Sequence, residues 1–137
     1  MGGATMTDQL QVLIVEDEAI SALALRIMLE AVGLRVRDVV DTGEAAVALA
    51  REHRTDLVLM DVQLAGELSG VAAARQLQQI GGMHCVFISA YGVEQLPELA
   101  AYPDSEVLVK PVTEEQVLAL IERLRPPPGA ASGAAPG

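Results

Sequence analysis

The chain is poor in cysteine, aromatic residues and lysine, and each shortage argues against a class of structure or function. Cys85 is the only cysteine among 137 residues, so an internal disulfide or a zinc site built from several cysteines is excluded. Aromatic residues make up only 2% of the chain, so stacking platforms for nucleic acid bases are not expected. Lys110 is the only lysine and the net charge is -10, which argues against binding to nucleic acid phosphates.

Long apolar runs are also missing. No run approaches the roughly 20 residues that a membrane span needs, and residues 1–11 lack the basic and apolar segments of a signal peptide. We therefore expect no membrane contact and a cytoplasmic location, which also suits a chain with one cysteine.

The length and the 51% hydrophobic content predict one domain with its own core, at residues 9–125. Residues 1–8 are predicted to be a flexible N-terminus, and residues 126–137 (PPPGAASGAAPG) a disordered tail.

Short apolar runs alternate with helical patterns along the predicted domain. The runs predict strands at Leu10–Val15, Val36–Val40, Leu57–Met60, Cys85–Ile88 and Glu106–Val109. Nearly continuous apolar strands separated by helices are typical of a parallel sheet that is covered on both faces. We therefore predict an α/β fold of the flavodoxin-like (βα)5 type, with strand order 2-1-3-4-5 and helices on both faces.

The first and last helices are predicted from their apolar spacing. In the first helix, one apolar face is predicted from Ile20, Leu23, Ala24, Ile27, Met28 and Ala31. In the last helix, the apolar stripe consists of Val117, Leu120, Ile121 and Leu124. A weaker helical pattern covers Glu94–Ala101.

Capping residues predict where three of the helices begin. Asp41 with Glu44 resembles a capping box, and so does Thr113 with Gln116. Ser69 is a candidate N-cap for a helix that runs to about residue 80.

Polar residues follow four of the predicted strands. Acidic residues 16–18 follow the first strand, Asp61 the third, Ser89 the fourth and Lys110 the fifth. In the predicted strand order, the first and third strands are neighbours, so Glu16, Asp17 and Asp61 would converge. Carboxylates packed together repel one another, and a divalent cation relieves that repulsion. Oxygen ligands in this number suit Mg²⁺.

Taken singly, each of these residues is interpreted more simply as a solvated turn or cap residue. Their joint arrangement favours phosphoryl transfer. Lys110 and Ser89 would form an anion site opposite the cation. Asp61 is ionised at pH 7, so as a nucleophile it would form an acyl phosphate without a general base.

Four segments then resemble the receiver domain of two-component response regulators. They are VLIVEDE (Val12–Glu18), DLVLMDVQLAGELSG (Asp56–Gly70), FISAY (Phe87–Tyr91) and VLVKP (Val107–Pro111). The resemblance covers about Leu10 to Leu124. It suggests a single-domain response regulator without a DNA-binding output domain.

The resemblance implies a role for each residue at the strand ends. Asp61 would be the phosphoacceptor, and Glu16 and Asp17 the acidic pair, with Asp17 as a direct Mg²⁺ ligand. The backbone carbonyl of Gln63 would be a further ligand. Ser89 would be the switch hydroxyl. Lys110 would bind the phosphoryl oxygens. The peptide bond between Lys110 and Pro111 is often cis in this family.

The chain departs from the family pattern at one switch position. Val107 stands where the family usually has an aromatic residue, and Tyr91 is a candidate substitute. Gln63 and Tyr91 flank the phosphoacceptor and are expected to tune dephosphorylation.

The resemblance also implies protein partners. A sensor histidine kinase or a histidine phosphotransfer protein would supply the phosphoryl group, and a downstream protein would bind the face formed by the fourth strand, fourth helix and fifth strand. Two alternatives stay open: a pseudo-receiver that binds proteins without being phosphorylated, and a small Mg²⁺-dependent phosphatase.

Overall fold

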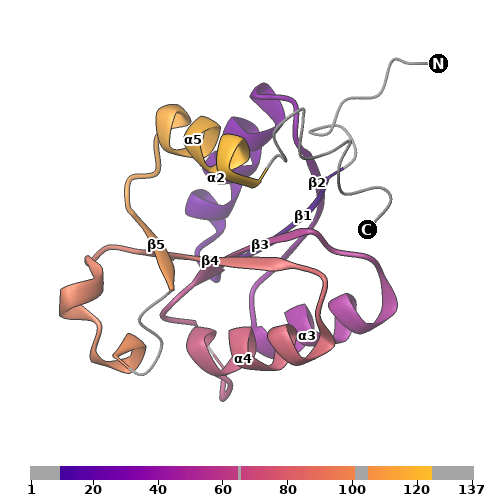
Figure 1. Cartoon of the computed structure of the whole chain (residues 1–137), viewed down its shortest axis with the longest axis vertical. Coiled ribbons are helices and arrows are strands. Elements are labelled where there is room, and N and C mark those ends of the chain that lie inside the picture. The colour runs from indigo at the N-terminus through magenta and orange to yellow at the C-terminus, as the bar shows by residue number, and fades with distance from the viewer. Residues whose placement is uncertain (1–9, 65, 101–104, 125–137) are drawn as a thin grey trace, which may run out of the picture.

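Five parallel strands form the middle layer of the fold (Figure 1). The computed structural model describes residues 10–64, 66–100 and 105–124. The strands are β1 (Gln11–Val15), β2 (Arg35–Val40), β3 (Leu57–Asp61), β4 (His84–Ser89) and β5 (Glu106–Val109). Their order in the sheet is β2-β1-β3-β4-β5, which confirms the predicted fold class and strand order.

Four α-helices among the described residues cover the two faces of the sheet. They are α2 (Ala19–Ala31), α3 (Gly43–Glu52), α4 (Gly70–Ile80) and α5 (Glu114–Leu124). Helices α2 and α5 lie on one face, and α3 and α4 on the other (Figure 1). Alternate strand residues point to opposite faces, so Leu13 and Met60 pack toward α3 and α4, while Ile14 and Leu59 pack toward α2 and α5. The strands are therefore buried on both sides.

The predicted fourth helix, Glu94–Ala101, is wrong as an α-helix. Two short 3₁₀ helices, η1 (Val93–Gln95) and η2 (Pro97–Leu99), occupy this stretch, and residue 101 lies outside the described residues. Pro97 has no N–H to donate to an i−4 carbonyl, and it disfavours helical geometry at the residue before it. Leu96 accordingly has φ -119° and ψ 84°. Leu96 and Leu99 are buried in the core beside α4, so packing holds the segment without a regular helix.

One of the predicted helix caps is also wrong. Thr42 is the N-cap of α3, because its Oγ1 accepts a hydrogen bond from Ala45 N at 3.1 Å. Asp41 was predicted for that role, but it lies one residue too early.

The other predicted caps are confirmed. Gln116 N donates to Thr113 Oγ1, and Thr113 N donates to Gln116 Oε1, which completes a capping box. Ser69 caps α4 by accepting from Ala72 N.

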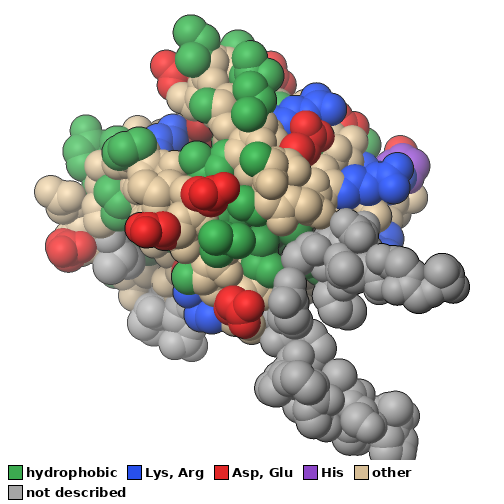
Figure 2. Space-filling model, turned by 90° about the horizontal axis from the view of Figure 1, so that it is seen from above, with side chains coloured by type: hydrophobic (Ala, Val, Ile, Leu, Met, Phe, Trp, Pro, Cys, Tyr) green, Lys and Arg blue, Asp and Glu red, His purple; other side chains and the backbone are tan. Residues whose placement is uncertain are grey.

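Helix α2 buries a different face from the one predicted. Ala22, Leu25 and Leu29 are its buried residues, whereas 82% of Ile20, 58% of Leu23 and 59% of Ile27 is exposed. Both faces of this helix carry apolar residues. The prediction from spacing therefore chose the face with more apolar residues, which is not the face that packs on the sheet. We call Ile20, Leu23 and Ile27 the α2 stripe. Figure 2, seen from the side of α2 and α5, shows hydrophobic side chains at the surface of this face.

Several predictions fall outside the described residues. The predicted flexible N-terminus (residues 1–8) and the predicted disordered tail (residues 126–137) both lie there, so they stay predictions. Within the described ranges, no helix is both long enough and apolar enough to cross a membrane.

The burial pattern of α2 predicts that truncating two of its leucines changes the free energy of unfolding by very different amounts. Leu29→Ala should lower the free energy of unfolding by about 2–5 kcal/mol, because Leu29 is fully buried and the change leaves a cavity. Leu23→Ala should change it by about 0.5 kcal/mol or less, because most of Leu23 is already in water. Urea denaturation of both variants measures the difference. Equal losses would contradict this difference in burial, and a larger loss in Leu23→Ala would mean that α2 packs through the stripe instead.

Candidate functional site

Strand pairing brings the predicted site residues to one edge of the sheet. Val15 in β1 pairs with Met60 in β3, so the residues that follow them, Glu16 and Asp61, are neighbours. On the other side of β3, the β4–β5 pairing aligns Ser89 with Val109. Lys110 follows directly, and its backbone N donates to Ser89 O at 2.7 Å. The carboxyl ends of four parallel strands therefore supply one site.

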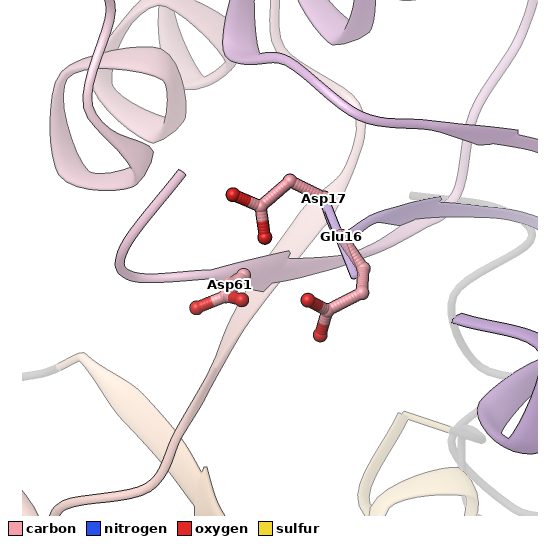
Figure 3. Close-up of side chains that lie close together, drawn as sticks. All are labelled: Glu16, Asp17 and Asp61. Carbon is pink, nitrogen blue, oxygen red and sulfur yellow. The ribbon is translucent and has the colours of Figure 1, made fainter. Parts of the chain in front are cut away.

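Three carboxylates meet at the centre of this edge. Oxygen atoms of Glu16, Asp17 and Asp61 lie within 4.8 Å of one another. Figure 3 shows the three side chains turned toward a common space, two from the end of β1 and one from the end of β3. Glu16 and Asp61 are buried, and Asp17 is exposed. Such a set of oxygen atoms, open to solvent on one side, fits a hard divalent cation.

Lys110 lies against the two buried carboxylates. Its Nζ is 3.0 Å from Glu16 Oε1 and 3.5 Å from Asp61 Oδ2. Burial alone would lower the pKa of Lys110, but the hydrogen bond to Glu16 and the negative charge of Asp61 outweigh it, so the pKa is raised. Lys110 therefore stays protonated and offsets part of the negative charge.

One ammonium does not fully compensate the buried pair. Burial raises the pKa of Glu16, and a side-chain hydrogen bond with Asp61 raises it further, against the opposing effect of Lys110. The Glu18 N–H also favours the ionised form by donating to Glu16 Oε2 at 3.1 Å. The site therefore retains an unfavourable excess of negative charge that a cation would relieve.

Backbone groups fix the orientation of Asp61. Gln63 N donates to Asp61 Oδ1 at 2.9 Å, which leaves Oδ2 facing Lys110. Gly70, the first residue of α4, packs directly on the backbone here: a Cβ atom at this position would lie 2.2 Å from Asp61 O. Only glycine permits this approach. This role of Gly70 was not predicted from the sequence, where its one signal is a glycine directly after a capping serine.

Of the remaining predicted residues, Ser89 and Gln63 border the same cleft as the carboxylates, and Tyr91 and Val107 are not among its lining residues. Ser89 is buried, and its Oγ accepts from Tyr91 N at 3.0 Å. The side chain of Tyr91 is half exposed, and Val107 packs against the core on the α3 and α4 side. Gln63 is exposed beside Asp61, and the Lys110–Pro111 peptide bond is cis, as the family resemblance implies.

An open cleft joins these groups. It has a volume of ≈ 440 Å³ and is lined by Glu16, Asp17, Asp61, Gln63, Ser89 and Lys110 among others. Carboxylates, an ammonium and a hydroxyl that line one cleft can bind a cation and an anionic group next to each other. All of the residues singled out at the strand ends border it. Glu44 was predicted only as part of a capping box, but it accepts a hydrogen bond from Leu68 N in the connection between β3 and α4.

The model of the response regulator receiver domain family matches residues 12–122. The chain is 33% identical over 114 residues to the phyllosphere-induced regulator PhyR of Methylorubrum extorquens, covering 82% of this chain and 42% of PhyR. It is 29% identical over 115 residues to the chemotaxis protein CheY of Bacillus subtilis, covering 82% of this chain and 95% of CheY.

Solved structures show the same similarity. The signal receiver domain of a modulated diguanylate cyclase from Desulfovibrio desulfuricans has 36% identity and a TM-score of 0.75, with 83% of this chain and 91% of that chain covered. The receiver domain of PhyR from Erythrobacter litoralis has 28% identity and a TM-score of 0.73, covering 84% and 88%. The chain spans about half the length of several curated relatives, namely 42% of one and 55% of another.

The charge imbalance predicts a stabilising substitution. Asp61→Asn should raise the free energy of unfolding in Mg²⁺-free buffer by about 1 kcal/mol, because it removes a buried charge beside Glu16 and keeps the Lys110–Glu16 pair. Asp41→Asn, an exposed residue after β2, is the matched control and should change stability by about 0.5 kcal/mol or less. Thermal unfolding compares the two. Destabilisation by Asp61→Asn would contradict the imbalance.

Proposed function

Because the chain belongs to the receiver domain family of response regulators, we propose that it accepts a phosphoryl group on Asp61 from a phosphohistidine of a partner protein. Receiver domains are signalling domains rather than enzymes in the usual sense, and they interact with histidine kinases or other proteins. The observation that supports this role most directly is a buried carboxylate, Asp61, between a lysine ammonium and two further carboxylates.

The proposed step is an in-line displacement at phosphorus. Asp61 Oδ2 attacks, the phosphorus–nitrogen bond of the phosphohistidine breaks, and its electron pair returns to the imidazole. The product on this chain is an acyl phosphate. Lys110 Nζ, already 3.5 Å from Asp61 Oδ2, binds a phosphoryl oxygen. Ser89 Oγ accepts from Tyr91 N, so its own proton remains available for a second phosphoryl oxygen.

Mg²⁺ is the proposed cofactor. Its ligands would be the carboxylates of Asp17 and Asp61 and the carbonyl oxygen of Gln63, with Glu16 close by. The all-oxygen donor set and the raised pKa of Glu16 support this choice. When bound, Mg²⁺ neutralises charge on both the carboxylates and the phosphoryl group.

The proposed output surface is the face of β4, η1, η2 and β5. Movement of Ser89 Oγ toward a phosphoryl group would break its hydrogen bond from Tyr91 N and alter the connection that follows β4. Val107 in β5 has no aromatic ring that could change position with Ser89. Tyr91 has a ring, lies on the connection that follows β4, and is half exposed. We therefore propose that Tyr91 presents the phosphorylated state to a downstream protein.

The α2 stripe supports docking of the phosphohistidine-bearing partner. Ile20, Leu23 and Ile27 are exposed on the helix that follows the acidic residues of the site. A largely apolar cavity of ≈ 350 Å³ lies between α2 and the β5–α5 connection. It is lined by Ala24, Met28, Pro111 and Val112, and it also reaches Glu16 and Lys110. Apolar surface next to a polar reaction site is typical of a protein-binding face.

Phosphorylation by a small donor tests the proposal without a known kinase. Incubation with Mg²⁺ and acetyl phosphate should add about 80 Da, the mass of one phosphoryl group in place of hydrogen. Intact-mass spectrometry measures it. Asp61→Asn should abolish the shift, and Asp41→Asn at the same sheet edge should retain it. A wild-type chain that gains no mass from acetyl phosphate or from a histidine kinase would support the pseudo-receiver alternative. Continuous turnover of donor without a phosphorylated chain would support the phosphatase alternative.

Lys110→Arg tests the need for a compact ammonium group. The variant keeps the charge, but a broad planar guanidinium cannot occupy the position 3.0 Å from Glu16 and 3.5 Å from Asp61 in the same way. The initial rate of phosphorylation by acetyl phosphate should fall by about tenfold or more. Arg54→Lys, the reverse exchange at an exposed ion pair, is the control. An unchanged rate in Lys110→Arg would remove this role from Lys110.

A further inference from the structure

The connection between β3 and α4 contains Gln63 and passes beside the carboxylate cluster. It is fixed at its start by the hydrogen bond from Gln63 N to Asp61 Oδ1. At its end, Ser69 caps α4, and Gly70 packs on Asp61 O. Between these points, Gly66 and Glu67 are exposed, so a contact from another element would help to hold this stretch in one conformation.

Glu44 supplies that contact from another helix. Its Oε2 accepts a hydrogen bond from Leu68 N at 3.2 Å, across 24 positions of the sequence. Glu44 is available for this bond because Thr42, not Asp41, caps α3. Leu68 lies two residues before α4, and its side chain packs on the core. The hydrogen bond between Glu44 and Leu68 N therefore joins the first turn of α3 to the end of the β3–α4 connection.

The conformation of the connection fits around the same carboxylate. Gly66 has φ +93°, a backbone angle that residues with a side chain rarely adopt. A Cβ atom at this position would also lie 3.3 Å from Glu44 Oε1. The backbone at Gly66 and the N–H of Leu68 therefore lie close to the two oxygens of one side chain.

We propose that Glu44 is a positioning residue, which holds the β3–α4 connection through Leu68 N so that the carbonyl of Gln63 stays in place for Mg²⁺. The inference rests on the proposed function, since it assigns Gln63 as a ligand. Glu44 itself is not part of the carboxylate cluster, so it acts on the cation through the backbone. Mg²⁺ demands near-octahedral geometry, so a ligand on a loosened connection binds it less well.

Two substitutions at position 44 separate the hydrogen bond from the charge. Glu44→Ala removes the acceptor, whereas Glu44→Gln keeps an oxygen that accepts from Leu68 N and removes only the charge. Glu52→Ala, at the far end of α3, controls for the loss of one acidic residue from the same helix. Glu44 is exposed, so all three variants should fold, and thermal unfolding checks this.

Two measurements are made on each variant. Amide hydrogen exchange of Leu68, followed by NMR without Mg²⁺, reports the hydrogen bond. Calorimetric titration with MgCl₂ reports the dissociation constant of Mg²⁺. In Glu44→Ala, both the exchange rate and the dissociation constant should rise by about fivefold, as expected for one lost hydrogen bond. In Glu44→Gln and Glu52→Ala, both should stay within about twofold of the wild type.

The outcomes separate this inference from the proposed function. Faster exchange of Leu68 in Glu44→Ala with unchanged Mg²⁺ affinity would overturn the positioning role and leave the phosphoacceptor proposal intact. Equal loss of Mg²⁺ affinity in Glu44→Ala and Glu44→Gln would also overturn it, because charge alone would then explain the effect. A wild-type chain that binds no Mg²⁺ would overturn the proposed cofactor and this role together, whatever the exchange of Leu68.

Discussion

Two buried carboxylates beside a single ammonium group are the constraint on which the rest of this site depends. The pairing of β1 with β3 forces Glu16 and Asp61 to be neighbours at this edge of the sheet. Lys110 contacts both and compensates one charge of the two. The folded chain therefore keeps a local excess of negative charge, which costs stability and creates affinity for a cation.

Strand pairing, core packing and backbone hydrogen bonds hold these carboxylates in place. The strand ends supply the charged groups, and both faces of the sheet are covered, so β1 and β3 cannot separate without exposing the core. Gly70 brings α4 against the backbone of Asp61, and hydrogen bonds from Gln63 N and Glu18 N orient the carboxylates. Reactive groups are thus held in place by rigid elements.

Much of the architecture was predictable because it depends on local patterns. The strands were marked by apolar runs, and the capping box of Thr113 and Gln116 was visible from spacing. The site followed from the strand order, since residues after parallel strands meet at one edge. Lys110 was distinctive as the one lysine in a chain that otherwise uses arginine.

The errors came from choices that only tertiary contacts decide. Both faces of α2 are apolar, and packing against the sheet selected Leu25 and Leu29 rather than Leu23. Asp41 and Thr42 are both good caps, and the hydrogen bond from Ala45 N selected the second. The contact between Glu44 and Leu68 joins residues 24 positions apart, and no local pattern predicts such a bond.

The most direct test of the account is chemical identification of the phosphorylated residue. After treatment with acetyl phosphate and Mg²⁺, borohydride reduces an aspartyl phosphate to homoserine, which tandem mass spectrometry locates in a peptide. The account predicts homoserine at position 61 and at no other aspartate. Homoserine at another position, or an intact Asp61 after complete phosphorylation, would contradict it.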